Sequence, residues 1–162
     1  MALIISDVES KLLNLKDEDI IIENNGHIHP CIGCFGCWVK TPGRCIIKDD
    51  YSDTGEKLGK CNELIIVSKC TYGSYSPFVK NVLDRAISYI HPDFVMRKGE
   101  MHHKRRYDNS IIMKVYFYGE AISEQEKETA RNLTKANAVN YDGLVQKVVF
   151  LKSRDELRGM SL

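Results

Sequence analysis

Four of the six cysteines of this chain lie close together in the stretch CIGCFGCWVKTPGRC, residues 31–45. Cys31, Cys34 and Cys37 are each separated by two residues, and Cys45 follows after seven more. A turn in each short gap brings thiolates to the same side of the chain, where soft sulfur ligands bind a 4Fe–4S cluster or a zinc ion. The spacing therefore makes these four cysteines candidate metal ligands.

The same cysteines have other interpretations. Reduced cysteine behaves as a small hydrophobic residue, so the four side chains also suit the wall of an apolar pocket beside Phe35 and Trp38. A thiol redox pair is a further alternative. His27 and His29 alternate with Cys31, so an extended segment would place all three on one face as metal ligands, although solvated loop histidines are the commoner outcome.

A second group of residues suited to ligand binding is CTYGSYS, residues 70–76, which follows the apolar run at 63–68. Its side chains offer hydroxyls and aromatic rings, and Gly73 lets backbone N–H groups approach a planar ligand closely. The alternative is that Tyr72 and Tyr75 only cover the end of a sheet.

Five short apolar runs predict buried β-strands, and the segments between several of them have helical periodicity. The predicted strands are 2–6, 19–23, 63–68, 110–119 and 143–151. Helices are predicted after Asp53, at 77–90 behind the capping residue Ser76, and at 123–139, where Ser123 and Glu126 form a capping box. The segment 10–16 has helical spacing over barely two turns.

Strands that alternate with helices predict an α/β fold with a mostly parallel sheet and helices on both faces. Five such units are typical of a flavodoxin-like, doubly wound sheet with strand order 2-1-3-4-5, in one domain over residues 1–162. Ligands of such sheets bind at the carboxyl ends of the strands, which places the loop 70–76 at the expected site. A cysteine-rich loop (27–50) and a basic loop (91–109) complete the prediction.

The sequence YGSYSPFVKNVLDR, residues 72–85, resembles the tyrosine–glycine–serine loop and the following helix of NAD(P)H-dependent FMN reductases. The cysteine segment resembles the CxxCxxC…C loop of the iron–sulfur flavoproteins in the same flavodoxin-like superfamily. The resemblance extends over most of residues 1–152, and its specific part is 31–50 and 63–90. It implies that FMN binds at the strand ends and that its ring is contacted by Lys69, Cys70, Thr71, Tyr72, Gly73, Ser74 and Tyr75, flanked by Tyr118 and Gly119.

The residues after the first predicted strand depart from the pattern of these relatives. Relatives have a Gly/Ser/Thr-rich loop there, whose backbone amides and hydroxyls bind the FMN phosphate. This chain reads SDVESK, without glycine, and Asp7 and Glu9 would face the phosphate. Ser6 and Ser10 are the candidate phosphate contacts, although Ser10 suits a helix N-cap equally well. The alternatives are a phosphate bound by basic residues of the cysteine loop, and a protein that binds flavin weakly or not at all.

The stretch RKGEMHHKRRY, residues 97–107, is the most basic part of the chain. Long connections in compact domains tend to be functional or to pack on another subunit. Lys104, Arg105 and Arg106 are therefore candidates for binding the phosphates of a pyridine nucleotide, or of FMN in a neighbouring subunit. The alternative is a solvated basic flap.

The charge balance excludes several classes of partner. The formal net charge is +1, so no overall field attracts nucleic acid or an anionic membrane. The apolar run after Met1 is short and is followed by acidic residues, unlike a signal peptide or a membrane span. A cytoplasmic location is expected, where cysteines stay reduced.

The expected function is that of an FMN-dependent oxidoreductase, which passes electrons from NADH, NADPH or another carrier to a small-molecule acceptor. The cofactor performs the chemistry in such proteins, so no catalytic side chain is assigned. One alternative is an electron-transfer protein of the iron–sulfur flavoprotein type, working with a redox protein partner. Another is a flavin-free binding or metal-sensing protein of the same fold. A homodimer is expected because the superfamily builds flavin pockets near subunit contacts.

Overall fold

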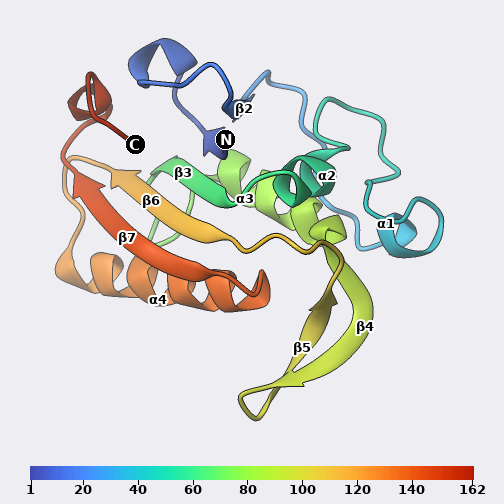
Figure 1. The fold of residues 1–162 in the computed structure, drawn as a ribbon. Coiled ribbons are helices and arrows are strands. Elements are labelled where there is room, and N and C mark those ends of the chain that lie inside the picture. Colours follow the sequence, from blue (N-terminus) through green and yellow to red (C-terminus); the bar gives the residue numbers. More distant parts are fainter.

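The computed structural model describes residues 1–162, and a five-stranded parallel sheet forms its centre (Figure 1). Its strands are β1 (Ala2–Ser6), β2 (Ile20–Glu23), β3 (Glu63–Lys69), β6 (Ile112–Tyr118) and β7 (Leu144–Leu151). Their order in the sheet is β2-β1-β3-β6-β7, which is 2-1-3-4-5 when only these five strands are counted along the chain. The predicted flavodoxin-like, doubly wound α/β fold is confirmed.

The register of the sheet places the carboxyl ends of its strands at one edge. Ile4 of β1 is aligned with Ile21 of β2 and with Ile65 of β3, and Lys69 at the end of β3 is aligned with Tyr118 at the end of β6. Because all five strands are parallel, the carboxyl ends of β1, β3 and β6 lie at the same edge, on either side of the switch in strand order. The loops that leave this edge are therefore the first place to look for a ligand.

The three longer α-helices cover one face of the sheet. They are α2 (Thr54–Gly59), α3 (Pro77–Arg85) and α4 (Glu124–Asn140). Their caps are those that the sequence predicts, since the Ser76 hydroxyl accepts from the Val79 amide and Ser123 forms a capping box with Glu126. The core on this face joins Leu58, Val79, Val82 and Ala130 of the helices to Leu3, Ile66, Val115 and Phe117 of the strands. None of the helices has the length and apolar character needed to cross a bilayer.

The opposite face is covered by short 3₁₀ helices only, namely η1 (Ser10–Leu12) and η3 (Arg154–Leu157). Leu12, Leu13 and Leu157 pack there against Ile65 and Tyr116 of the sheet. The predicted helical segment 10–16 forms only η1, so the crossover from β1 to β2, residues 7–19, contains no α-helix. No α-helix N-terminus therefore points at the end of β1.

The prediction of a basic loop over residues 91–109 is wrong for most of its length. The chain leaves α3 through η2 (Ala86–Tyr89) and forms an antiparallel hairpin of β4 (Ile90–Arg97) and β5 (Glu100–Arg105), which projects from the body of the molecule in Figure 1. Lys98 and Gly99 connect the strands with positive φ angles of 51° and 83°, as a type I′ turn requires. The signal for this hairpin was Gly99 between two alternating segments.

The basic residues of the hairpin are mostly used within the chain. Arg97 and Arg105 both form ion pairs with Asp142, which follows α4, and Arg106 donates to the Ser88 carbonyl at 2.9 Å. These contacts fix the hairpin to the body of the molecule. Among the three residues suggested as phosphate ligands, Lys104 alone is both exposed and without an ion pair.

Candidate functional site

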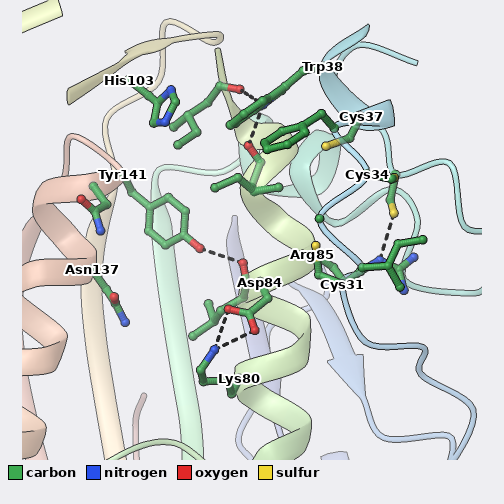
Figure 2. Close-up of a pocket in the computed structure, with 18 of the residues that line it drawn as sticks. Cys31, Cys34, Cys37, Trp38, Lys80, Asp84, Arg85, His103, Asn137 and Tyr141 are labelled. Carbon is green, nitrogen blue, oxygen red and sulfur yellow. Dashed lines mark hydrogen bonds and ion pairs between the residues drawn. The ribbon is translucent and has the colours of Figure 1, made fainter. Parts of the chain in front are cut away.

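A cavity of about 740 Å³ lies on the helical face between the cysteine loop, α3, α4 and the hairpin (Figure 2). All four cysteines suggested as metal ligands line it, namely Cys31, Cys34, Cys37 and Cys45. Ser74 and Tyr75, from the loop that the family resemblance assigns to the flavin ring, line it as well. The cavity is mostly apolar with a few polar groups, which is typical of a small-molecule or cofactor site.

The cysteine loop forms one wall of this pocket. The short helix α1 (Gly36–Val39) begins after Phe35, whose backbone φ is 56°, and buries Cys37, whereas Cys31 and Cys34 are exposed. Burial raises the pKa of the Cys37 thiol, and the negative charges of Cys45, Cys31 and Cys34 raise it further. The other three sulfurs are thus close enough to Cys37 to act on it electrostatically. No three His, Cys, Asp or Glu side chains, however, converge on a single metal position.

Arg85, at the end of α3, fastens the cysteine loop to the helix. Its guanidinium is fully buried and forms a bidentate ion pair with Asp49, both N–O distances being 2.8 Å. It also donates to the carbonyls of His29 and Ile47, and its Nε donates to the Cys45 sulfur at 3.1 Å. The loop is therefore attached on both sides of the cysteine run by one side chain.

The electrostatics of Asp49 follow from this attachment. Burial alone would raise the pKa of the Asp49 carboxyl, but hydrogen bonds from Arg85 and from the backbone N–H groups of His29 and Tyr51 outweigh it and lower the pKa. Besides the buried ion pair, Asp49 accepts from the Tyr51 amide at 3.1 Å and so also stabilises the turn that follows it.

Aromatic rings form the upper wall of the pocket. Trp38 stacks on Phe35 with ring centroids 5.5 Å apart and contacts the His103 ring at 5.0 Å, and His103 contacts Phe94 at 4.7 Å. The Trp38 indole N–H donates to the carbonyls that precede and begin β4, those of Ile87 and Ile90. The predicted placement of Phe35 and Trp38 beside the cysteines is confirmed, whereas His103 reaches them only because residues 100–105 form a strand.

Polar groups gather on the side of the pocket opposite the cysteines, as Figure 2 shows. Lys80 of α3 pairs with Asp84 one turn later at 2.7 Å, and Asn137 of α4 donates to the Tyr75 hydroxyl at 3.4 Å. Tyr141 is buried and donates to the Leu83 carbonyl. The pocket therefore combines a thiol wall and an aromatic wall with amide, ammonium and carboxylate groups.

The loop after β3 is a tight turn rather than an open cradle. Thr71 and Ser74 exchange backbone hydrogen bonds at 2.9 Å, and Tyr72 and Gly73 between them have positive φ angles of 53° and 75°. A side chain at Gly73 would collide with the backbone of α4, because a Cβ there would lie 2.9 Å from the Glu126 carbonyl oxygen.

The two tyrosines suggested as flavin contacts have opposite environments. Tyr72 is 90% exposed and free to cover a ligand. Tyr75 is buried, stacks on Phe117 with centroids 5.4 Å apart, and belongs mainly to the core. The remaining residues assigned to the ring, Lys69, Cys70, Thr71 and Gly73, lie at the strand ends outside the large pocket, as do Tyr118 and Gly119.

The end of β1, where a phosphate would bind, is closed by the chain itself. The Ser6 hydroxyl is bonded to the amide and the carbonyl of Val8, and the Ser10 amide donates to the Glu23 carboxylate. Asp7 accepts from the Lys69 amide at 2.9 Å and from the Tyr118 hydroxyl at 3.1 Å. The residues present do not fit the phosphate of FMN, because most of the loop amides that would bind it already have partners and carboxylates surround the site.

Arg85 and the hairpin are the functional elements that sequence reasoning missed. Arg85 follows Phe78 and Val82 at helical spacing on the buried face of α3, and a charged residue on such a face signals a buried ion pair. The signal for the hairpin was present too, but basic composition obscured it. The polar groups of α4 had no signal, since Asn137 is one of several polar residues on an amphipathic helix.

No protein-family model matches this chain. Among characterised proteins, an iron–sulfur flavoprotein of Methanocaldococcus jannaschii is 29% identical to it over 79 residues. The matched segment covers 49% of this chain and 36% of the relative. The chain is thus similar over about half its length to a protein named as an iron–sulfur flavoprotein, and it matches little more than a third of that protein.

Proposed function

We propose that this protein transfers electrons and that its redox centre is a 4Fe–4S cluster held by Cys31, Cys34, Cys37 and Cys45. The observation that carries the proposal is the position of all four cysteines on one wall of the 740 Å³ pocket. A bound cluster of this kind supplies one-electron transfer. The thiol donor set suits iron, and the name of the relative from Methanocaldococcus jannaschii supports the same role.

The residues around the cysteines have defined roles in this proposal. The Arg85 Nε–H group donates to the Cys45 sulfur at 3.1 Å, and hydrogen bonds to ligand sulfurs tune the potential of a cluster. Trp38 and Phe35 stack on each other and form an aromatic wall beside the cysteines. The opposite side, with Lys80 and Asn137, is left for a small-molecule acceptor or for a side chain of a redox protein partner. Reduced thiols of this kind suit a cytoplasmic setting.

Anaerobic reconstitution tests the proposal. The purified chain is incubated with ferrous iron and sulfide and desalted, and iron, sulfide, visible absorption and the electron paramagnetic resonance of the reduced sample are measured. About four iron and four sulfide ions per chain are expected, with one-electron reduction of the centre.

Two serine variants make this test specific. Cys34→Ser removes an exposed ligand of the cysteine loop and should abolish most of the iron uptake. Cys70→Ser changes a half-buried cysteine outside the loop and should leave the uptake unchanged. A wild-type chain that retains no iron, or a Cys34→Ser variant that retains as much as the wild type, would contradict the proposal.

A second candidate function is the flavin-dependent oxidation of NADH or NADPH. The exposed Tyr72 ring favours it, because the turn that carries it leaves the end of β3, where doubly wound sheets bind nucleotides. Mixing the chain with riboflavin or FMN and then with NADH or NADPH, with and without an added acceptor, tests this candidate. A flavin-dependent loss of nicotinamide absorption supports it, and a rate equal to that of free flavin counts against it.

A further inference from the structure

We infer that Asp7 occupies the position of a ligand phosphate at the carboxyl edge of the sheet, so that this edge rejects phosphate-bearing ligands such as FMN in favour of phosphate-free ones such as riboflavin. The inference deepens the second candidate function, because it names the class of flavin that the strand ends would take. It does not depend on the iron–sulfur proposal.

Asp7 is the first residue after β1. In doubly wound folds the loop after the first strand presents backbone N–H groups to a phosphate, usually at the start of a helix. Here the Asp7 carboxylate occupies that loop as an anion supplied by the chain. One carboxylate oxygen accepts from the Lys69 amide of β3 at 2.9 Å, and the other accepts from the Tyr118 hydroxyl of β6 at 3.1 Å. Asp7 thus joins the ends of β1, β3 and β6 through its carboxylate.

Most backbone N–H groups of the loop after β1 already have a hydrogen-bond acceptor. The Asp7 amide donates to the Val67 carbonyl, the Val8 amide to the Ser6 hydroxyl, and the Ser10 amide to the Glu23 carboxylate. The 3₁₀ helix η1 has only three residues, and its N-cap Glu9 makes no capping hydrogen bond. Among the amides of residues 7–11 only those of Glu9 and Lys11 therefore remain without a partner, so a phosphate arriving at this edge would meet few free N–H groups.

The charge around the loop after β1 is unfavourable for an anion. Asp7, Glu9 and Glu23 place three carboxylates around the loop, against Lys11 and Arg154 as the nearby cations. Lys11 is already paired with Glu9. Burial, together with the Asp7 charge, raises the pKa of the Tyr118 phenol, so that Tyr118 stays protonated and continues to donate to Asp7. A second anion would add repulsion without gaining hydrogen bonds.

Flavin titrations test the inference with two Asp7 variants. Asp7→Gly removes the carboxylate and frees both the Lys69 amide and the Tyr118 hydroxyl, whereas Asp7→Asn removes the charge and retains an acceptor. We expect the wild type to bind FMN no more tightly than riboflavin. We expect Asp7→Gly to bind FMN about ten-fold more tightly than the wild type, with Asp7→Asn between the two and riboflavin affinity changed little.

The matched control is Glu9→Gln, which removes one negative charge from the same turn and frees no amide. It should raise the ratio of FMN to riboflavin affinity by less than Asp7→Gly does, because it removes charge without freeing an amide. Circular dichroism and urea unfolding establish that each variant is folded, and Asp7→Asn carries the test if Asp7→Gly is not. A wild type that binds FMN about ten-fold more tightly than riboflavin, or folded Asp7 variants without any gain for FMN, would overturn the inference.

Inorganic phosphate separates this inference from the flavin candidate. Amide resonances of the ¹⁵N-labelled chain are followed during a phosphate titration, with chloride at the same ionic strength as the reference. The Lys69 amide should be unaffected in the wild type and should shift in Asp7→Gly. If no variant binds riboflavin, the flavin candidate fails while the phosphate result still decides the role of Asp7. A Lys69 amide that responds equally to phosphate in both proteins would overturn the inference.

Discussion

Arg85 shows how much one residue contributes to the architecture of this site. Its buried guanidinium binds the Asp49 carboxylate, two carbonyls and the Cys45 sulfur, so nearly all of its N–H groups have partners inside the molecule. Breaking such a pair leaves a buried charge without compensation, which costs far more than the loss of an exposed pair. The helix α3 carries one pair of each kind, and this allows a direct comparison.

We predict that Arg85→Gln lowers the free energy of unfolding by about 3–5 kcal/mol, because Asp49 would remain buried and unpaired. Lys80→Gln is the matched control, since Lys80 pairs with Asp84 on the exposed side of the same helix and its loss should cost less than about 1 kcal/mol. Urea unfolding followed by circular dichroism measures both. Equal losses in the two variants would show that Arg85 does not support the loop.

Single residues were predictable from the sequence where their spacing carries the information. The four cysteines were expected to lie together and they line one pocket, because a run of short gaps keeps them close in any conformation. Arg85 and Asp49 are far apart in the chain, and nothing local links them. Ser6 and Ser10 look like phosphate ligands as residue types, but the Ser6 hydroxyl is bonded to Val8 and the Ser10 amide to Glu23, which depends on packing.

At the scale of elements, the hairpin of β4 and β5 extends the pocket wall. Phe94 and His103 are opposite each other in its register and both face the cavity, while the two arginines that pair with Asp142 hold the hairpin against the end of α4. An isolated two-stranded hairpin is at best marginally stable in water. Its order therefore depends on these side-chain contacts.

We predict that Asp142→Asn increases amide hydrogen exchange in residues 94–103 about five-fold, because it removes both ion pairs while asparagine tolerates the positive backbone φ of 53° at this position. Asp93→Asn is the control on the same hairpin, where the exposed carboxylate meets only His91. Hydrogen exchange of residues 94–103, followed by mass spectrometry, measures the effect in both variants. Unchanged protection in Asp142→Asn would place the restraint elsewhere.

The strands and longer helices were predicted to within a few residues, because apolar runs and capping residues are local signals. The crossover from β1 to β2 was ambiguous, since SKLLNLK has helical spacing over a length that cannot support a stable helix. The hairpin was missed because the basic residues of its turn and of β5 obscured the alternation of its two strands. Its apolar side includes Met96 and Met101, which pair across the two strands.

At the scale of the whole molecule, the two faces of the sheet are unequal, and the aromatic core lies on the helical one. Tyr75, Tyr89 and Tyr141 are buried there. Burial raises the pKa of the Tyr89 phenol to about 12, and it also raises the pKa values of Tyr75 and Tyr141. A phenol whose folded pKa is raised stabilises the protein fully below its unfolded pKa, and this contribution is lost as the pH rises through the folded value.

We predict that the protein loses stability between pH values of about 10, where unfolded tyrosine ionises, and about 12, the folded pKa of Tyr89. Tyr89→Phe should flatten this loss by an amount on the order of 2 kcal/mol, because one linked ionisation is removed. Tyr72→Phe, which alters an exposed side chain, should leave the profile unchanged. Urea unfolding at several alkaline pH values provides the measurement, and identical profiles for Tyr89→Phe and the wild type would contradict the prediction.

The attachment of the cysteine loop to Arg85 at both of its ends affects how iron would bind to its cysteines. The Arg85 guanidinium donates to the His29 carbonyl and to the Asp49 carboxylate, and the His29 amide also donates to Asp49. Residues 30–48 therefore form a loop whose two ends are held together. A loop whose ends are held together has already lost the conformational entropy of loop closure. Bringing the four sulfurs around iron then requires rearrangement only within this loop. The rest of the domain should keep its secondary structure, so the far-ultraviolet circular dichroism should be the same before and after iron binding.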